Sequence, residues 1–233
     1  HAGRTPADEV PLAALVDLSD GLEPALAAAR ARVGRGHRTL KAKVGVDLER
    51  AGDALAALRA AHADVALRVD ANGTLDVATS ARFLSVLAEL GVALLEEPFE
   101  ADALAGAAPL PVPVALDESL QREGARAQLA TLADAGRAQA LVLKPMALGG
   151  LRRSLALAAT RPLPAIVSHL FDGPVAWAAS AALALALGPQ NYAAGLGRHA
   201  GFDAWPPWDL PGDVGAVLRR WTSPGLGLEV DRS

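Results

Sequence analysis

The chain has 233 residues, of which 52% are hydrophobic, and a formal net charge of −4. This length suits one domain with a sizeable core, since a β/α barrel needs roughly 250 residues. The acidic balance, without a basic patch, excludes nucleic acid as an expected partner, and no apolar run reaches the ~20 residues of a membrane span. The chain has no cysteine, which excludes disulfides and thiolate metal sites and fits a reducing compartment, so we expect a cytoplasmic location.

Short apolar runs bounded by turn residues alternate along the chain with Ala-rich helical segments. The runs predict eight strands, over residues 10–16, 39–43, 65–70, 92–96, 112–117, 140–144, 164–168 and 192–196. The segments between them predict helices over 21–33, 47–62, 76–90, 121–135, 151–159 and 174–187, with a short helix after residue 98. We therefore expect a β/α catalytic domain over 10–200, between a loose tail over 1–9 and a C-terminal tail over 201–233.

Alternation of strands and helices gives a parallel sheet, either closed into a barrel or open and doubly wound. The open sheet usually concentrates its site in one or two Gly-rich turns, and no such motif follows the first predicted strand. Polar residues instead end strand after strand, and barrels carry their sites at the C-terminal ends of several strands. The sequence therefore predicts an α/β barrel.

Lysine is rare in this chain, which has three lysines and 19 arginines. Lys41 and Lys43 lie two positions apart in one predicted strand, so their side chains share a face. Lys144 ends the sixth predicted strand. An isolated lysine pair is usually an exposed edge of a strand. In a chain that uses arginine for its surface charge, the lysines point to chemistry, because lysine can lose its proton and arginine cannot.

Three carboxylates end consecutive predicted strands, with 26 residues between Asp70 and Glu96 and 21 between Glu96 and Asp117. Each interval is one strand–helix unit, so adjacent barrel strands would bring the three to one rim. They would repel one another there unless a cation bound between them. A single strand-terminal Asp is more often a helix N-cap, but three together, flanked by lysines, indicate a metal site. Oxygen ligands alone favour a hard ion, Mg²⁺ first.

Five motifs together resemble the barrel of the enolase superfamily, muconate-lactonizing subgroup, over roughly residues 10–200. They are Lys41-x-Lys43, Asp70-x-Asn72, Glu96-Glu97-Pro98, Asp117-Glu118-Ser119 and Leu143-Lys144-Pro145. Within that subgroup, the segments 67–72 and 143–150 are most similar to the o-succinylbenzoate synthases. Members of the superfamily carry an N-terminal α+β capping domain, and we expect that domain to be missing from this chain, because nothing ahead of Val10 resembles it.

The resemblance implies a modified TIM barrel, (β/α)7β, with Mg²⁺, or Mn²⁺ in its place, on Asp70, Glu96 and Asp117. It implies syn-dehydration of a small-molecule carboxylate, 2-succinyl-6-hydroxy-2,4-cyclohexadiene-1-carboxylate, to o-succinylbenzoate in menaquinone biosynthesis, through a metal-stabilised enediolate. The expected catalytic residues are Lys43 as the base, Lys144 as a cation over the other face of the substrate, and Lys41. The expected substrate-binding residues are Asn72, Arg68, Ser168, His169 and Gly195.

Two of these residues have alternative interpretations. Ser168-His169-Leu-Phe171 resembles the mandelate-racemase subgroup, where a His on this strand is a second base oriented by an Asp one strand earlier. Lys144 occupies that earlier place, so we expect His169 to line the pocket or to pack. Arg68 fits a salt bridge below the metal site as well as it fits contact with substrate.

The sequence alone leaves several other functions possible. N-acylamino-acid racemase uses the same two lysines, and a muconate cycloisomerase comes next. The absence of a D-x-D pair after the eighth predicted strand counts against a dipeptide epimerase. A barrel that no longer catalyses, kept as a structural subunit, is the non-enzymatic rival. The oligomeric state is open on the sequence.

Overall fold

The computed structural model of the chain describes residues 5–188, 190–199, 201–202, 205, 210, 212 and 215–228. Its strands are β1 (Glu9–Pro11), β2 (Ala14–Val16), β3 (Thr39–Lys43), β4 (Ala66–Asp70), β5 (Leu94–Glu96), β6 (Val114–Leu116), β7 (Ala140–Leu143), β8 (Ala165–Val167) and β9 (Val217–Arg219). Its helices are α1 (Leu22–Gly34), α2 (Leu48–Ala61), α3 (Ala81–Glu89), α4 (Ala101–Gly106), the 3-10 helix η1 (Glu118–Gln121), α5 (Ala125–Asp134), α6 (Leu151–Ala158) and α7 (Pro174–Leu187). Among the described residues, no helix has the length and apolar character needed to cross a membrane.

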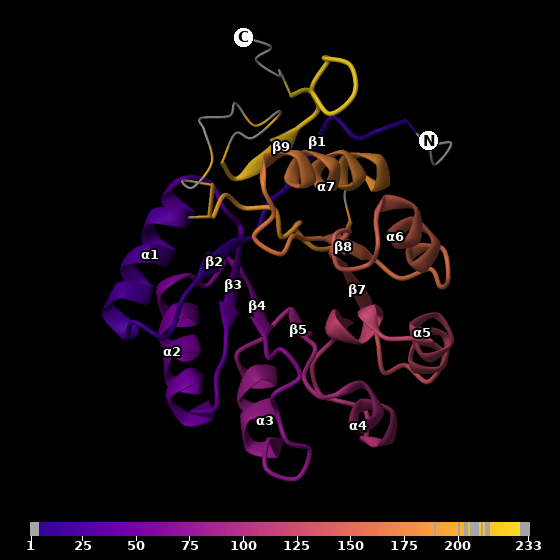
Figure 1. Cartoon of the computed structure of the whole chain (residues 1–233). Coiled ribbons are helices and arrows are strands. Elements are labelled where there is room, and N and C mark those ends of the chain that lie inside the picture. Colours follow the sequence, from indigo (N-terminus) through magenta and orange to yellow (C-terminus); the bar gives the residue numbers. More distant parts are fainter. Residues whose placement is uncertain are drawn as a thin grey trace.

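Seven parallel strands form one sheet in the order β2-β3-β4-β5-β6-β7-β8, and the sheet curls inside a ring of helices (Figure 1). The two edge strands meet across the segment 194–195. There Ala194 N donates to Pro11 O at 2.8 Å, and Gly195 N donates to Val167 O at 2.8 Å. Parallel bridges join Leu12 to Ala194 and Ser168 to Gly195. The curled parallel sheet confirms the predicted α/β class, and the eighth predicted strand is reduced to these bridges.

Apolar side chains cover both faces of the sheet, which explains why the strands read as continuous apolar runs. The inner face carries a small core of Leu94, Ala115, Ala140, Val142 and Ile166, with Tyr192 packed against it. The outer face packs on the helices in a larger core that includes Leu40, Leu67, Leu95, Leu116 and Leu141. Inward-facing positions beyond the small core, towards the carboxyl ends of the strands, are polar. The sheet therefore seals one end of its interior and leaves the other for a site.

The first predicted strand, over residues 10–16, is two strands in the structure. β1 leaves the barrel sheet and pairs antiparallel with β9, with Val10 opposite Leu218. Both side chains are buried in a cluster with Trp177 of α7, so burial of apolar surface accounts for this pairing. Residue 9 of the predicted loose tail and residues 217–219 of the predicted C-terminal tail thus belong to one ribbon. Residues 1–4 and much of 201–233, Trp208 included, lie outside the described residues.

Aspartate side chains bond to the backbone at the start of α2 and ahead of α3. Asp47, where the sequence predicts the helix to begin, is the N-cap of α2, and its carboxylate accepts a hydrogen bond from Arg50 N at 3.0 Å. Asp76 does not begin α3. Its carboxylate instead accepts from Ala78 N and Thr79 N, both at 3.0 Å, and stabilises a turn ahead of the helix.

Candidate active site

Three carboxylates meet at the carboxyl ends of adjacent strands. Asp70 ends β4 and is in register with Glu96 at the end of β5, while Asp117 directly follows β6. One ligand oxygen of each lies within 4.8 Å of the others, and all three side chains are buried. We name Asp70, Glu96 and Asp117 the acidic cluster. The structure thus brings together the three residues whose spacing predicts a shared rim.

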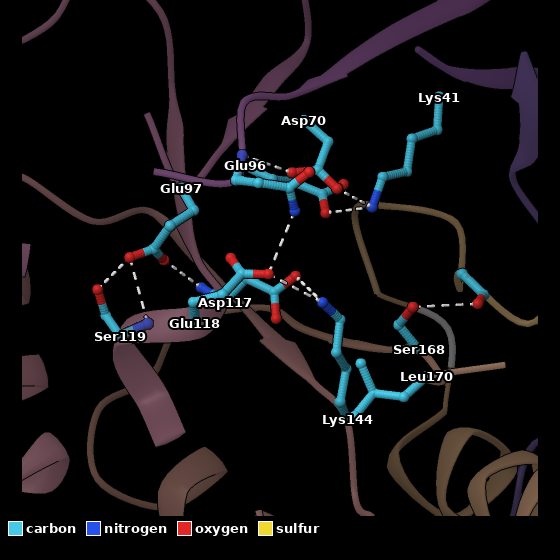
Figure 2. A network of polar contacts seen from close by, with 12 residues as sticks. Lys41, Asp70, Glu96, Glu97, Asp117, Glu118, Ser119, Lys144, Ser168 and Leu170 are labelled. Atoms are coloured by element: carbon cyan, nitrogen blue, oxygen red, sulfur yellow. Dashed lines mark hydrogen bonds and ion pairs between the residues drawn. The ribbon is translucent and has the colours of Figure 1, made fainter. Parts of the chain in front are cut away.

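Two lysines contact the acidic cluster from different strands, as Figure 2 shows. Lys41 Nζ lies 2.6 Å from Glu96 Oε2 and 2.8 Å from Asp70 Oδ2. Lys144 Nζ lies 2.5 Å from Asp117 Oδ2 and 3.3 Å from Glu118 Oε1. β3 and β7 are separated by three strands, so these ammonium groups approach from opposite sides of the sheet interior.

Burial and neighbouring charges shift the pKa values of these groups in opposite directions. Burial opposes ionisation of Asp117 and raises its pKa, while the nearby ammonium of Lys144 acts in the opposite direction. Burial lowers the pKa of Lys144, but the carboxylate of Asp117 outweighs it, so the net shift is upward. Burial likewise opposes ionisation of Glu96, and the charges of Arg68 and Lys41 outweigh it and lower that pKa. Lys144 is therefore held as a cation.

The acidic cluster fits a hard cation. Its donors are all carboxylate oxygens, the ligand type that Mg²⁺ and Mn²⁺ prefer. Within the described residues, Asp117 Oδ1 is buried without a hydrogen-bond partner. A buried carboxylate oxygen of this kind is available to bind a metal ion. Asp70, Glu96 and Asp117 are thus the residues that would hold a divalent metal.

Lys43 differs from its neighbour Lys41. The two share a face of β3, but Lys43 is exposed, and its ammonium makes no hydrogen bond or ion pair within the described part of the chain. It lines a cavity of about 710 Å³ together with Val46, Asn72 and Thr74. Lys43 is also in register with Asp70 on the next strand. An exposed amine therefore borders an open cavity at the carboxyl end of β3, one strand away from Asp70.

Arg68 lies below the acidic cluster inside the barrel and is 1% exposed. Its Nε donates to Glu96 Oε1 at 2.6 Å, and its Nη1 donates to Ala193 O at 2.6 Å. This geometry favours the salt bridge over contact with substrate, because the guanidinium is enclosed by protein.

The other predicted substrate-binding residues lie around the same rim. Asn72 has a φ of 46° and donates from Nδ2 to Glu118 Oε1 at 3.2 Å. Ser168 Oγ donates to Gly195 O at 3.1 Å. A Cβ at Gly195 would lie 2.7 Å from Ser168 Oγ, so only glycine leaves room for that hydroxyl. These three residues are positioned at the mouth of the barrel, and their contact with substrate stays a prediction.

His169 is bonded through both ring nitrogens to the loops around it. Its Nδ1 accepts from Phe171 N at 3.0 Å, so Nε2 carries the proton towards Gly197 O at 3.1 Å. Its ring lies 4.7 Å from that of His199. Burial lowers the pKa of His169 to about 4, and it is neutral near pH 7. The packing interpretation of His169 agrees with this geometry.

Sequence reasoning gave no role to Glu97 and Glu118, although both lie in the motifs. Glu118 Oε1 lies 3.3 Å from Lys144 Nζ and accepts a hydrogen bond from Asn72. Glu97 is 2% exposed and accepts hydrogen bonds from Asp117 and Ser119. A signal for Glu97 was the second carboxylate of Glu96-Glu97-Pro98, directly after a buried strand.

A family model described as enolase C-terminal domain-like matches residues 25–233. The chain belongs to this family. The resemblance to the enolase superfamily is thereby confirmed, and the site described above lies where members of a β/α barrel family carry theirs. Solved structures show the same fold. Muconate cycloisomerase from Pseudomonas fluorescens superposes with a TM-score of 0.85 at 26% identity, covering 99% of this chain and 65% of that one. The dipeptide epimerase from Enterococcus faecalis superposes with a TM-score of 0.80 at 21% identity, covering 96% of this chain and 67% of that one, which shows the fold alone.

Several sequence relatives are named o-succinylbenzoate synthase. The protein from Thermobifida fusca is 38% identical over 56% of this chain and 41% of its own length. The Mycobacterium tuberculosis protein is 34% identical over 84% of this chain and 60% of its own length. The Geobacillus kaustophilus protein is 29% identical over 93% of this chain and 59% of its own length. The chain thus spans less than two thirds of the length of these relatives.

Proposed function

We propose that the protein is a Mg²⁺-dependent lyase that dehydrates 2-succinyl-6-hydroxy-2,4-cyclohexadiene-1-carboxylate to o-succinylbenzoate. The observation that carries the proposal is the strand order: Lys43 ends β3 and Lys144 directly follows β7, on either side of the three strands whose ends carry the acidic cluster. The names of the sequence relatives, which match up to 93% of this chain, support the choice of this reaction within the superfamily.

Each lysine has a distinct task in a syn-elimination. Nζ of Lys43 takes the proton from the ring carbon next to the substrate carboxylate, and the same group then gives it to the departing hydroxide. Water leaves, and the ring becomes aromatic. Lys144 needs only to remain a cation near the conjugated ring, and Asp117 favours that form.

The remaining residues prepare the site. Lys41 neutralises and orients the carboxylates of Asp70 and Glu96, and Arg68 supports Glu96 from below. A Mg²⁺ or Mn²⁺ ion held by the acidic cluster would polarise the substrate carboxylate and so acidify the neighbouring proton. Asn72, Ser168 and Gly195 shape the mouth through which a small carboxylate reaches Lys43.

N-acylamino-acid racemisation is the second candidate. Opposed lysines also suit that reaction, because one can remove a proton from one face while the other delivers a proton to the opposite face. A muconate cycloisomerase comes third, and the Pseudomonas fluorescens structure with that name has the same fold. A barrel without activity is the remaining alternative, and the exposed amine of Lys43 beside an open cavity counts against it.

The test measures the activity of the protein on the cyclohexadiene carboxylate and on an N-acylamino acid, each in the presence of Mg²⁺. We expect loss of the cyclohexadiene chromophore and little deuterium uptake from heavy water into either enantiomer of an N-acylamino acid. Asp117→Asn serves as the control and should lose the activity. Brisk racemisation without consumption of the cyclohexadiene would replace the synthase by the racemase.

A further inference from the structure

Glu97 connects the three strand ends that carry the acidic cluster. It directly follows Glu96, and its backbone N donates to Ala115 O at 2.9 Å, next to the end of β6. Its carbonyl oxygen accepts from Gly73 N at 2.6 Å, in the turn that follows Asp70 and β4. The backbone of Glu97 has a φ of 38°, a left-handed conformation that non-glycine residues rarely adopt.

The side chain of Glu97 extends the connection to the third ligand (Figure 2). Its Oε2 accepts a hydrogen bond from the backbone N of Asp117 at 2.6 Å. Its Oε1 accepts from Ser119 N at 3.2 Å and from the Ser119 hydroxyl. One buried carboxylate therefore fixes the backbone on both sides of Glu118, where β6 turns into η1.

These contacts leave Glu97 no oxygen for a metal ion. Both oxygens already accept from protein donors, and Glu97 is not among the carboxylates that converge in the acidic cluster. Asp117, in contrast, has a buried oxygen without a hydrogen-bond partner in the described residues. Lys144 contacts Oδ2 of Asp117, so the placement of Oδ1 depends on the Asp117 backbone, and Glu97 holds that backbone.

We propose that Glu97 is a positioning residue of the metal centre, which sets the placement of Asp117 and its spacing from Asp70 and Glu96. The inference rests on the metal site of the proposed function. Residues that orient metal ligands typically change metal affinity by about 10- to 100-fold when they are mutated. Loss of the Glu97 carboxylate should therefore weaken metal binding even where the protein stays folded.

The experiment measures the Kd of Mn²⁺ from the electron paramagnetic resonance signal of free Mn²⁺. Glu97→Ala should raise the Kd at least ~10-fold, in line with other residues that orient metal ligands. Glu97→Gln keeps one acceptor oxygen and should show a smaller rise. Ser119→Ala removes only the hydroxyl donor and leaves both backbone bonds to Glu97, so its Kd should stay near that of the wild type.

A matched control separates positioning from loss of stability. Leu104→Ala creates a cavity at a buried residue of α4 in the larger core between sheet and helices, and should lower the Tm without a change in the Kd of Mn²⁺. An unchanged Kd in folded Glu97→Ala overturns the proposal. Should that variant fail to fold, Glu97→Gln decides, and a Kd equal to that of Ser119→Ala overturns it. Failure of wild-type protein to bind Mn²⁺ would instead refute the metal site itself.

Discussion

Arg68 supports Glu96 from inside the barrel, with Nε of the guanidinium 2.6 Å from Oε1 of the carboxylate. Neither side chain is more than 1% exposed. The same guanidinium donates to Ala193 O in the segment that closes the sheet. One buried cation therefore links a candidate metal ligand to the closure of the barrel.

Replacement of Arg68 by Met should destabilise the protein strongly. Removal of one partner of a buried ion pair costs about 3–5 kcal/mol, and we expect the lower end because Lys41 still neutralises Glu96. A loss of about 3 kcal/mol corresponds to a fall in Tm of roughly 6–12 °C for a domain of this size. Arg161→Met, which breaks an exposed pair with Asp134, is the control and should change the Tm little. Equal Tm values for the two variants would contradict the supporting role of Arg68.

Divalent metal should stabilise the protein through the acidic cluster. Binding to the folded state alone raises the free energy of unfolding by about 2.7 kcal/mol at a metal concentration 100 times the Kd. Calorimetry with increasing Mg²⁺ or Mn²⁺ should therefore show a rising Tm, and Asp117→Asn should weaken the effect. Asp134→Asn, on the surface, should respond as the wild type does. A Tm that is independent of both metals would refute the site.

The two lysines should respond differently to replacement by arginine. Lys43→Arg should abolish dehydration, because arginine cannot act as the base. Lys144→Arg keeps the charge and changes the shape, so part of the dehydration should survive. Any racemase activity should be lost completely in both variants, since racemisation needs proton transfer at both faces. Activity retained by Lys43→Arg and lost by Lys144→Arg would reverse the assigned roles.

Stability should fall at acidic pH through His169. Its pKa is about 4 in the folded protein, below the ordinary value of 6.5 for histidine, because burial opposes the charged form and His199, Lys41 and Lys144 repel it. The unfolded chain thus binds more protons between these values, so the stabilisation is complete above pH 6.5 and is lost as the pH falls towards 4. The shift in the pKa of His169 contributes at most about 3 kcal/mol to the free energy of unfolding.

Urea unfolding at several pH values checks this effect. His169→Gln cannot titrate, so its free energy of unfolding should depend less on pH than that of the wild type between pH 4 and 6.5. Parallel pH profiles for the two proteins would show that His169 does not carry the effect.

The sequence predicted the residues at the rim of the barrel well, because their placement depends only on the order of consecutive strand–helix units. Consecutive strand–helix units place successive strands side by side, so polar residues that end strands converge whatever the details of the helices. Asp70, Glu96 and Asp117 come together for that reason. The cap of α2 at Asp47 was predictable for a similar reason, since its partner lies three residues away.

Features that depend on distant or unusual contacts were beyond the sequence. The pairing of β1 with β9 joins two three-residue strands from opposite ends of the chain, and such short strands have no periodic signal. The different environments of Lys41 and Lys43 arise because β3 ends at Lys43, where the cavity begins. The second carboxylate of Glu96-Glu97-Pro98 marked Glu97, but its neighbours in the sequence do not predict a left-handed backbone at a residue other than glycine, so its contacts were missed.

The closure of the sheet at 194–195 also bears on how the chain reaches its native state. Neighbours within the seven-stranded sheet are also neighbours in sequence, whereas Leu12 and Ala194 must meet from distant parts of the chain. Contacts of long sequence separation form late and slowly. Until residues 194–195 pair with both edges, β2 and β8 expose unpaired backbone groups that can bind other chains. A nascent or truncated chain that lacks residues 190–199 is therefore expected to aggregate, even with every strand of the sheet already made.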